Sequence, residues 1–118
     1  KSRPAWRAAL QSNLEVRVLE EMARQGLAVP VTQFPMRLPD RDIAIDFAWP
    51  SVKFAVEVDH PAWHDGALES HADKGRDRKL TTMGWTSARI TDIDVNGGLT
   101  EAVADIGHIL TRLTLAVV

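Results

Sequence analysis

Three acidic side chains stand inside the most apolar stretch of the sequence. Asp46, Glu57 and Asp59 interrupt the segment 43–59, whose other residues are mostly isoleucine, valine, phenylalanine, tryptophan and alanine. A carboxylate that leaves water for a half-buried sheet costs several kcal/mol unless a partner compensates its charge. Three such side chains predict a shared cationic partner, and a divalent metal ion is the simplest candidate.

Residue types in this segment alternate in a way that predicts a β-hairpin. The ranges 43–49 and 52–59 place apolar side chains at every second position, as half-buried strands do. Pro50 and Ser51 supply a tight turn between them. We therefore expect two antiparallel strands with one wholly apolar face and with the acids on the other face.

The turn decides which residues face each other across the hairpin. In the register that it implies, Asp46 lies opposite Ala55, and Glu57 is its diagonal neighbour at roughly 7–8 Å. Small alanines on the same face leave room for an ion or a phosphate. A slip of one residue would move Asp46 to the other face, so the prediction depends on the turn.

Helical and extended patterns alternate along the rest of the chain, which predicts an α/β sandwich around a small mixed sheet, in the order α-β-β-β-α-β-α. Residues 1–11 are expected to be a basic lead-in, and residues 12–118 the domain itself. The capping-box spacing Ser12-x-x-Glu15 predicts where the first helix begins. The further elements expected are an edge strand at 31–37, a helix at 69–83, a strand at 85–91 and a last helix after Gly97-Gly98.

Composition bounds the class of protein. The chain has 118 residues, 45% hydrophobic and 25% charged, which are ordinary values for one globular domain. It has no cysteine, so disulfides and thiolate metal sites are excluded, and no apolar run has the length of a membrane span. The net charge of −2 argues against a strong non-specific polyanion binder but allows a local basic patch. The chain begins at Lys1 without a methionine, so we expect that it belongs to a longer protein with a linked domain.

The order of elements and several short motifs resemble the PD-(D/E)XK nuclease superfamily. More closely, they resemble an uncharacterised bacterial branch, the very-short-patch-repair-like endonuclease domain family. The match spans about residues 12–113, and it rests on Ser12-x-x-Glu15, Gln33-x-Pro35, Ile45-Asp46-Phe47-Ala48-x-Pro50, Val56-Glu57-Val58-Asp59, Trp63-His64, Arg76-Asp77-x-x-x-Leu80 and Gly84-Trp85. The resemblance implies a restriction-endonuclease-like three-layer α/β/α core, DNA as substrate and a bacterial cytoplasmic location.

The chain departs from these families at two positions. Asp59 stands where the superfamily usually has lysine, as it also does in the closer family. His60-Pro61 follows where the closer family usually has glycine, which alters the exit from the sheet and leaves the activity of the site open.

The resemblance implies a metal site made of the three acids. Asp46, Glu57 and Asp59 would hold Mg²⁺, with Mn²⁺ as a substitute, through the oxygen ligands that this ion prefers. The alternative is that these are strand-end acids paired with Lys53, Arg89 or an arginine of the second helix.

Two further residues are candidates for the catalytic site. Glu15 would support the metal, although it also fits a purely local role as a capping-box acid. His64 would stabilise the leaving group or act as a general acid, although it also fits a loop residue beside a packed Trp63.

Contacts to nucleic acid are expected from one strand and from the second helix. Gln33 is placed to orient water or phosphate, or else lies on an exposed strand edge. Lys74, Arg76, Arg78 and Lys79 are candidates for phosphate contacts, or else form a solvated, salt-bridged helix face. Arg76 has the most inward position of these, which also allows it to pair with a site carboxylate.

These residues together predict a Mg²⁺-dependent deoxyribonuclease domain, a metal-dependent DNA endonuclease that hydrolyses phosphodiester bonds. The alternative is a catalytically degenerate module on the same fold, which binds nucleic acid or belongs to a toxin–antitoxin system. A third hypothesis is a plain interaction domain. A homodimer through the last helix or the apolar tail is compatible with each of them.

Overall fold

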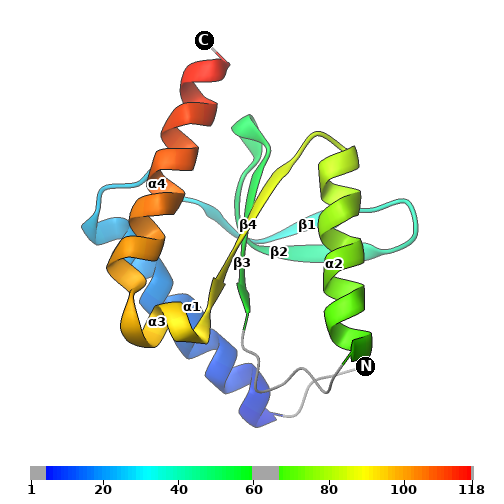
Figure 1. Cartoon of the computed structure of the whole chain (residues 1–118), viewed down its shortest axis with the longest axis horizontal. Helices are drawn as coiled ribbons and strands as arrows, with labels where there is room; N and C mark the ends of the chain where they lie inside the picture. The colour runs from blue at the N-terminus through cyan, green and yellow to red at the C-terminus, as the bar shows by residue number, and fades with distance from the viewer. Residues whose placement is uncertain (1–4, 60–66, 118) are drawn as a thin grey trace.

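The computed structural model describes the backbone of residues 5–59 and 67–117, and the side chains of residues 13–59, 75–91 and 93–117. Figure 1 shows the arrangement of its elements. In chain order they are α1 (Ala5–Arg24), β1 (Val31–Arg37), β2 (Asp42–Trp49), the 3₁₀ helix η1 (Pro50–Val52), β3 (Phe54–Asp59), α2 (Ala67–Thr82), β4 (Thr86–Thr91), α3 (Asp92–Gly97) and α4 (Leu99–Ala116).

The four strands form one mixed sheet in the order β1-β2-β3-β4. β1 and β3 pair antiparallel with β2, while β4 pairs parallel with β3 after the crossover through α2. β1 is an edge strand, which is where a sheet tolerates the missing N–H of Pro35. The mixed sheet and the edge position of this strand confirm the predictions.

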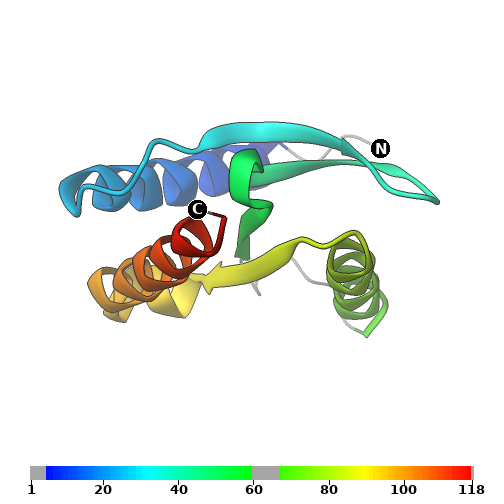
Figure 2. The ribbon, with the colours of Figure 1, turned by 90° about the horizontal axis from the view of Figure 1, so that it is seen from above.

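Helices cover both faces of the sheet, so the predicted three-layer α/β/α arrangement is confirmed. Figures 1 and 2 show α1, α3 and α4 on one side and α2 on the other. The larger core lies under the three helices and the smaller one under α2. The larger core is formed by Leu14, Val18, Met22, Phe47, Trp49, Phe54, Val56, Val58, Ile90, Val95, Val103, Ile106 and Leu110, and the smaller core by Leu38, Ile45, Ala48, Ala55, Leu80 and Trp85.

Three predicted features of the hairpin are wrong. Phe47 pairs with Val56, so the register differs by two residues from the expected one, because η1 and the left-handed Lys53 (φ 52°) replace the tight turn. The shift places Asp46 directly opposite Glu57. The single apolar face is not observed either, because Ile45 packs in the smaller core while Phe47 and Val56 pack in the larger one. The alanine face also leaves no room for an ion at 48 and 55, since those alanines pack in the smaller core with Ile45, Leu80 and Trp85.

The helix boundaries also differ from the predictions. α1 begins at Ala5, so Ser12 lies within the helix and is not its N-cap, and the helix includes most of the expected lead-in. The short α3 was not predicted. It begins where β4 ends, with a capping box between Thr91 and Asp94.

Among the described residues, the structure contains no helix that is both long and apolar enough to cross a membrane.

Candidate active site

The central feature of the site is a fork between two strands. β2 and β3 pair at only three positions, ending at Phe47 and Val56, although both strands continue. β2 stays paired with β1 and β3 with β4, so the sheet opens between them, as the diverging directions of β2 and β3 in Figure 1 show. Asp46 and Glu57 occupy the first facing positions beyond the last pair.

The two carboxylates take over hydrogen bonds that a continuous ladder would have made. The backbone N–H of Asp46 donates to Oε2 of Glu57 at 3.2 Å, and the N–H of Val58 donates to Oδ2 of Asp46 at 2.9 Å. Only 6% of Asp46 and 4% of Glu57 is exposed. Backbone amides therefore fix one oxygen of each buried carboxylate, which compensates part of the cost of burying it.

Gln33 holds the second oxygen of Asp46. Its amide nitrogen donates to Oδ1 of Asp46 at 3.2 Å and to Oε1 of Glu15 at 3.0 Å, which links α1, β1 and β2. The backbone of Gln33 is left-handed, with φ 50°, an uncommon conformation for a glutamine. Strained backbone of this kind persists where the surrounding contacts impose it, and it concentrates at functional sites.

Arg76 holds the second oxygen of Glu57. Its Nη2 forms an ion pair with Oε1 of Glu57 and donates to the carbonyl oxygen of Ala44 at 2.9 Å. The guanidinium reaches the fork from α2, on the opposite side of the sheet from α1. Its Nε is buried and has no hydrogen-bond partner.

Burial dominates the electrostatics of Glu57. Loss of solvent, and after it the nearby charge of Asp46, raise its pKa to about 8, against the opposite effect of Arg76. The pair thus lacks positive charge, because one guanidinium faces two buried carboxyl groups.

The structure supports the predicted residues to different degrees. Asp46, Glu57, Gln33 and Glu15 meet in one hydrogen-bonded network, although Glu15 reaches the carboxylates through Gln33. Asp59 ends β3, half-buried and level with Thr91 of β4. Among the described residues no group of three or more histidine, cysteine, aspartate or glutamate side chains is placed to hold a metal ion, so Asp59 does not complete a triad there.

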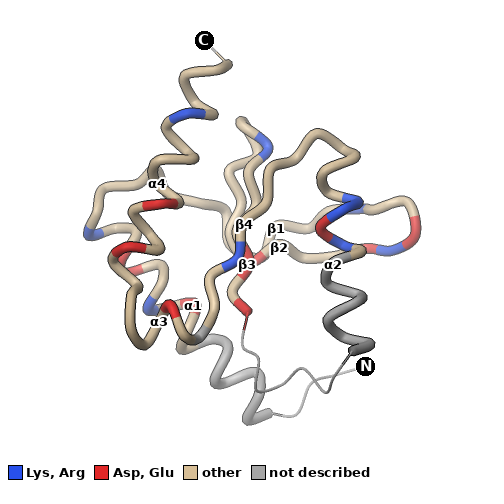
Figure 3. The backbone as a smooth tube through the Cα atoms, in the orientation of Figure 1, with Lys and Arg blue, Asp and Glu red and all other residues tan. Residues whose placement is uncertain are grey.

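Several candidates lie outside this network. His60 and His64, and the side chain of Lys74, are outside the described residues. Arg78 is exposed and Lys79 half-buried on α2, where Figure 3 shows basic and acidic residues interleaved.

One of the predicted pairings is observed at Glu57. An arginine of α2, Arg76, pairs with a site acid, as that alternative predicts. Arg89 lies level with Glu57 in the sheet but donates to both carboxylate oxygens of Asp77, at 3.1 and 3.2 Å. This second pair ties α2 to β4, and sequence reasoning missed it. Asp77 directly follows Arg76 in the sequence, and it was the acidic residue of α2 to consider as a partner of Arg89.

Sequence reasoning also missed the backbone groups of the site. The carbonyl of Ala44 and the N–H groups of Asp46 and Val58 have no sequence signature, since any residue type supplies them.

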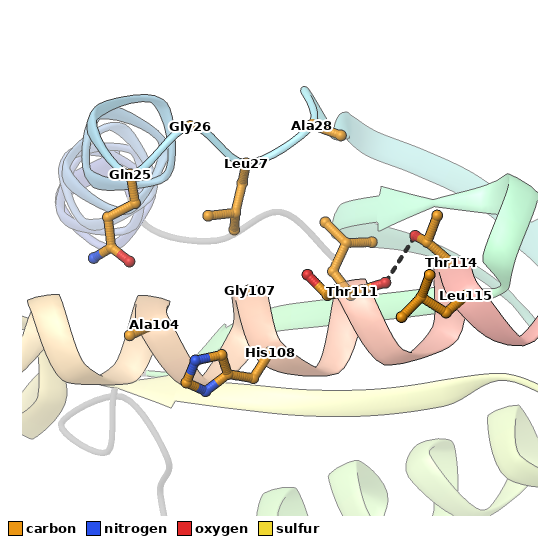
Figure 4. A pocket seen from close by; sticks show the side chains of 11 residues that line it. Gln25, Gly26, Leu27, Ala28, Ala104, Gly107, His108, Thr111, Thr114 and Leu115 are labelled. Carbon is orange, nitrogen blue, oxygen red and sulfur yellow. Dashed lines mark hydrogen bonds between the residues drawn. The ribbon is translucent and has the colours of Figure 1, made fainter.

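A separate pocket lies far from this chemistry. It is formed between the segment 25–28 and α4, as Figure 4 shows, and His108 is the titratable side chain in its lining. The lining contains no carboxylate, so this pocket lacks the ligands that a hard divalent cation prefers.

Comparisons with known proteins place the fold. No family model matches the chain. The uncharacterized proteins MT2308 and Rv2248 of Mycobacterium tuberculosis, from strains CDC 1551 / Oshkosh and ATCC 25618 / H37Rv, are each 33% identical to it over 107 residues. The match includes 90% of this chain but 40% of each relative, so the chain spans less than half the length of these curated relatives.

Among solved structures, the catalytic domain of the homing endonuclease I-Bth0305I superposes with a TM-score of 0.59. The superposition covers 87% of this chain and 94% of that domain, at 18% sequence identity. At that identity the likeness establishes the fold. The chain therefore has the α/β fold of an endonuclease catalytic domain.

Proposed function

We propose that this chain is a metal-dependent DNA endonuclease domain that hydrolyses phosphodiester bonds. The observation that carries the proposal is the buried pair of Asp46 and Glu57, each fixed by a backbone amide at the point where two strands separate. Carboxylates held this way are arranged before any ligand arrives, as catalytic groups must be. The fold shared with an endonuclease catalytic domain supports the same conclusion.

The donor set fits a divalent cation. Asp46 and Glu57 offer hard carboxylate oxygens, the ligands that Mg²⁺ and Mn²⁺ prefer. Arg76 supplies the only positive charge hydrogen-bonded to them among the described contacts, and its Nε is unsatisfied. Asp46 and Glu57 would hold the ion. A bound ion would polarise the scissile phosphate and acidify a water molecule.

The remaining residues are assigned supporting roles. Gln33 orients the carboxylate of Asp46 and couples it to Glu15, because its amide binds both. His64 is proposed to donate the proton that the leaving oxygen requires. Arg78 and Lys79 of α2 are proposed to bind the DNA backbone beside the fork, since α2 already reaches the site through Arg76.

One observation favours the alternative, a nucleic-acid-binding module without turnover. The described residues contain no metal-binding group of three side chains, and an arginine already neutralises Glu57. A module of this kind would bind DNA through α2 and leave it intact.

A nicking assay separates the two functions. Supercoiled plasmid is incubated with Mg²⁺ or Mn²⁺ and the wild type, Asp46→Asn, Glu57→Gln or the control Asp105→Asn, which makes the same change at an exposed position of α4. We expect nicking by the wild type and the control, and a loss of at least about a hundredfold in both site variants. Equal nicking by all four proteins would indicate a contaminant and contradict the proposal. DNA binding without nicking under either metal would favour the alternative.

A further inference from the structure

Arg76 reaches both arms of the fork from a third element. Ala44 belongs to β2 and Glu57 to β3, and Nη2 of Arg76 binds a group on each. The arginine itself belongs to α2, so three elements meet at one guanidinium. It closes the fork on the side opposite to Gln33.

Arg76 lacks one of the hydrogen bonds that a buried arginine with a purely structural role would be expected to make. Its Nε is buried without a partner, whereas buried donors in folded proteins are nearly always satisfied. Arg89, the comparison within the same fold, binds Asp77 through two nitrogens and two oxygens. The bidentate geometry that makes arginine pairs strong is therefore present at Arg89 and absent between Arg76 and Glu57.

The four carboxylate oxygens of the site fall into two kinds. Oδ2 of Asp46 and Oε2 of Glu57 accept from backbone N–H groups, which the strands hold in place. Oδ1 of Asp46 and Oε1 of Glu57 accept from the side chains of Gln33 and Arg76, which rotate away without unfolding the sheet. Oδ1 of Asp46 and Oε1 of Glu57 are therefore the two oxygens that a ligand is able to bind after these side chains move.

We infer that Arg76 is the resident counter-cation of the Asp46–Glu57 pair and that a divalent cation displaces it from Glu57. This inference rests on the proposed function, since it names what happens at the same site when the metal binds. Displacement frees Oε1 of Glu57 for the ion. It also releases the guanidinium beside the fork, where a DNA phosphate is its natural partner.

The exchange and a purely structural role of Arg76 predict opposite changes in metal affinity when Arg76 is removed. If Arg76 only holds the fork together, its removal disorders the carboxylates and weakens metal binding. If Arg76 competes with the metal, its removal leaves two buried carboxylates without their cation, and metal binding becomes tighter. The metal-free protein becomes less stable in both cases, so affinity is the measurement that discriminates.

The test is a Mn²⁺ titration of the metal-free chain by calorimetry, followed by thermal unfolding with and without the ion. Arg76→Met keeps an unbranched side chain of moderate length and removes the charge. Arg78→Met is the matched control, because it makes the same change at an exposed position of the same helix. We expect about tenfold tighter Mn²⁺ binding by Arg76→Met, within the range for one lost charged hydrogen bond. The control should stay within about twofold of the wild type, as surface charges do.

Equal or weaker Mn²⁺ binding by Arg76→Met overturns the exchange. If Arg76→Met does not fold, Arg76→Lys replaces it, since lysine keeps the charge without the fork-shaped donor set, and a several-fold gain in affinity is expected. Asp46→Asn in the same titration separates the two proposals. Loss of binding in Asp46→Asn together with an unchanged Arg76→Met contradicts the exchange alone. No binding by any variant, the wild type included, contradicts the metal site and the exchange together.

Discussion

Glu57 is the residue whose chemistry depends most on the fold. In water its carboxyl group would titrate near 4.5, but burial and the neighbouring Asp46 raise the pKa to about 8. The carboxyl group of Glu57 therefore keeps its proton to a higher pH than a free glutamate does.

This shift predicts a pH dependence of stability in a chelating buffer. The folded state binds the proton of Glu57 more tightly than the unfolded chain does, so stability is fully present below about 4.5 and is lost as pH rises through about 8. The free energy of unfolding, measured in urea between pH 5 and pH 8, should fall by a few kcal/mol in the wild type. Glu57→Gln cannot lose this proton, and its curve should be flatter over the same interval.

Asp105→Asn is the control for this measurement, since the side chain lies on an exposed face of α4. Its curve should keep the slope of the wild type. Parallel curves for Glu57→Gln and the wild type would mean that Glu57 is not the group that binds the proton.

At this scale the sequence predicts which acids matter but not how they are held. The charge of Asp46 and Glu57 in apolar strands marks them, and the inward position of Arg76 marks their partner. The left-handed φ of Gln33 has no signal, because glutamine is not a residue type that favours that region. The backbone donors are set by where the strands separate, which is a tertiary property.

The fork depends on a single connection, the turn between β2 and β3. A two-residue turn would continue the ladder in the expected register, whereas η1 and Lys53 lengthen the connection and shift the pairing by two residues. Pro50 is compatible with either conformation, so the local sequence does not decide between them. The faces of Phe47 and Val56 were predicted, but Ile45 packs in the opposite core to Phe47, which a strict period of two does not allow.

Helix ends were harder to predict than helix faces. The stripe of Val103, Ile106 and Leu110 in α4 is a periodic signal and was predicted, and these residues are buried. A capping-box spacing at Ser12 is only a local pattern, and it also occurs within a helix. α3 has 6 residues, too few to show a helical period. The capping-box spacing of Thr91 and Asp94 is the sequence pattern that indicates it.

Gly84 ends α2 and gives a prediction at the scale of elements. Its φ of +84° is in the region that other residues adopt with strain, and its N–H caps the helix by donating to the carbonyl of Thr81. Gly84→Ala should lower the free energy of unfolding by about 1 kcal/mol or more.

Gly97 offers the matched control, since it lies in α3 without a positive φ and an added Cβ meets nothing within 4 Å. Gly97→Ala should leave stability unchanged or raise it by up to about 1 kcal/mol, through the helix propensity of alanine. Chemical denaturation of both variants measures the contrast. Equal losses in the two variants would contradict the role of the left-handed cap.

At the scale of the whole molecule, the two helical layers have different tasks. α1, α3 and α4 cover the larger core, while α2 covers the smaller one and contributes Arg76 to the fork. The Asp77–Arg89 pair fixes α2 against β4. α2 therefore brings one of its basic side chains, Arg76, into the site.

The net charge of −2 limits how strongly the chain as a whole attracts DNA. A chain with no excess of positive charge gains little from long-range attraction, so phosphate contacts must come from a local group. The chain spans 40% of the length of its relatives, and further contacts outside it would add to the affinity of a longer protein. For this chain we expect weak binding that depends on α2.

The double substitution Arg78→Gln/Lys79→Gln tests this expectation. It removes two positive charges within one turn of Arg76, and each phosphate contact contributes about one unit to the slope of log affinity against log salt. Anisotropy titrations of a labelled duplex in EDTA, over a series of salt concentrations, should show affinity reduced about tenfold at low salt and a slope smaller by about two.

Arg24→Gln/Arg112→Gln is the control, because it removes the same charge from α1 and α4, where Arg24 and Arg112 are exposed. Net charge falls equally in both double variants, so a general electrostatic effect would weaken both to the same degree. A loss confined to the α2 variant would locate the DNA on the α2 side, within reach of the Asp46–Glu57 pair. A loss confined to the α1–α4 variant would place the DNA on the other face of the sheet and contradict the role of α2.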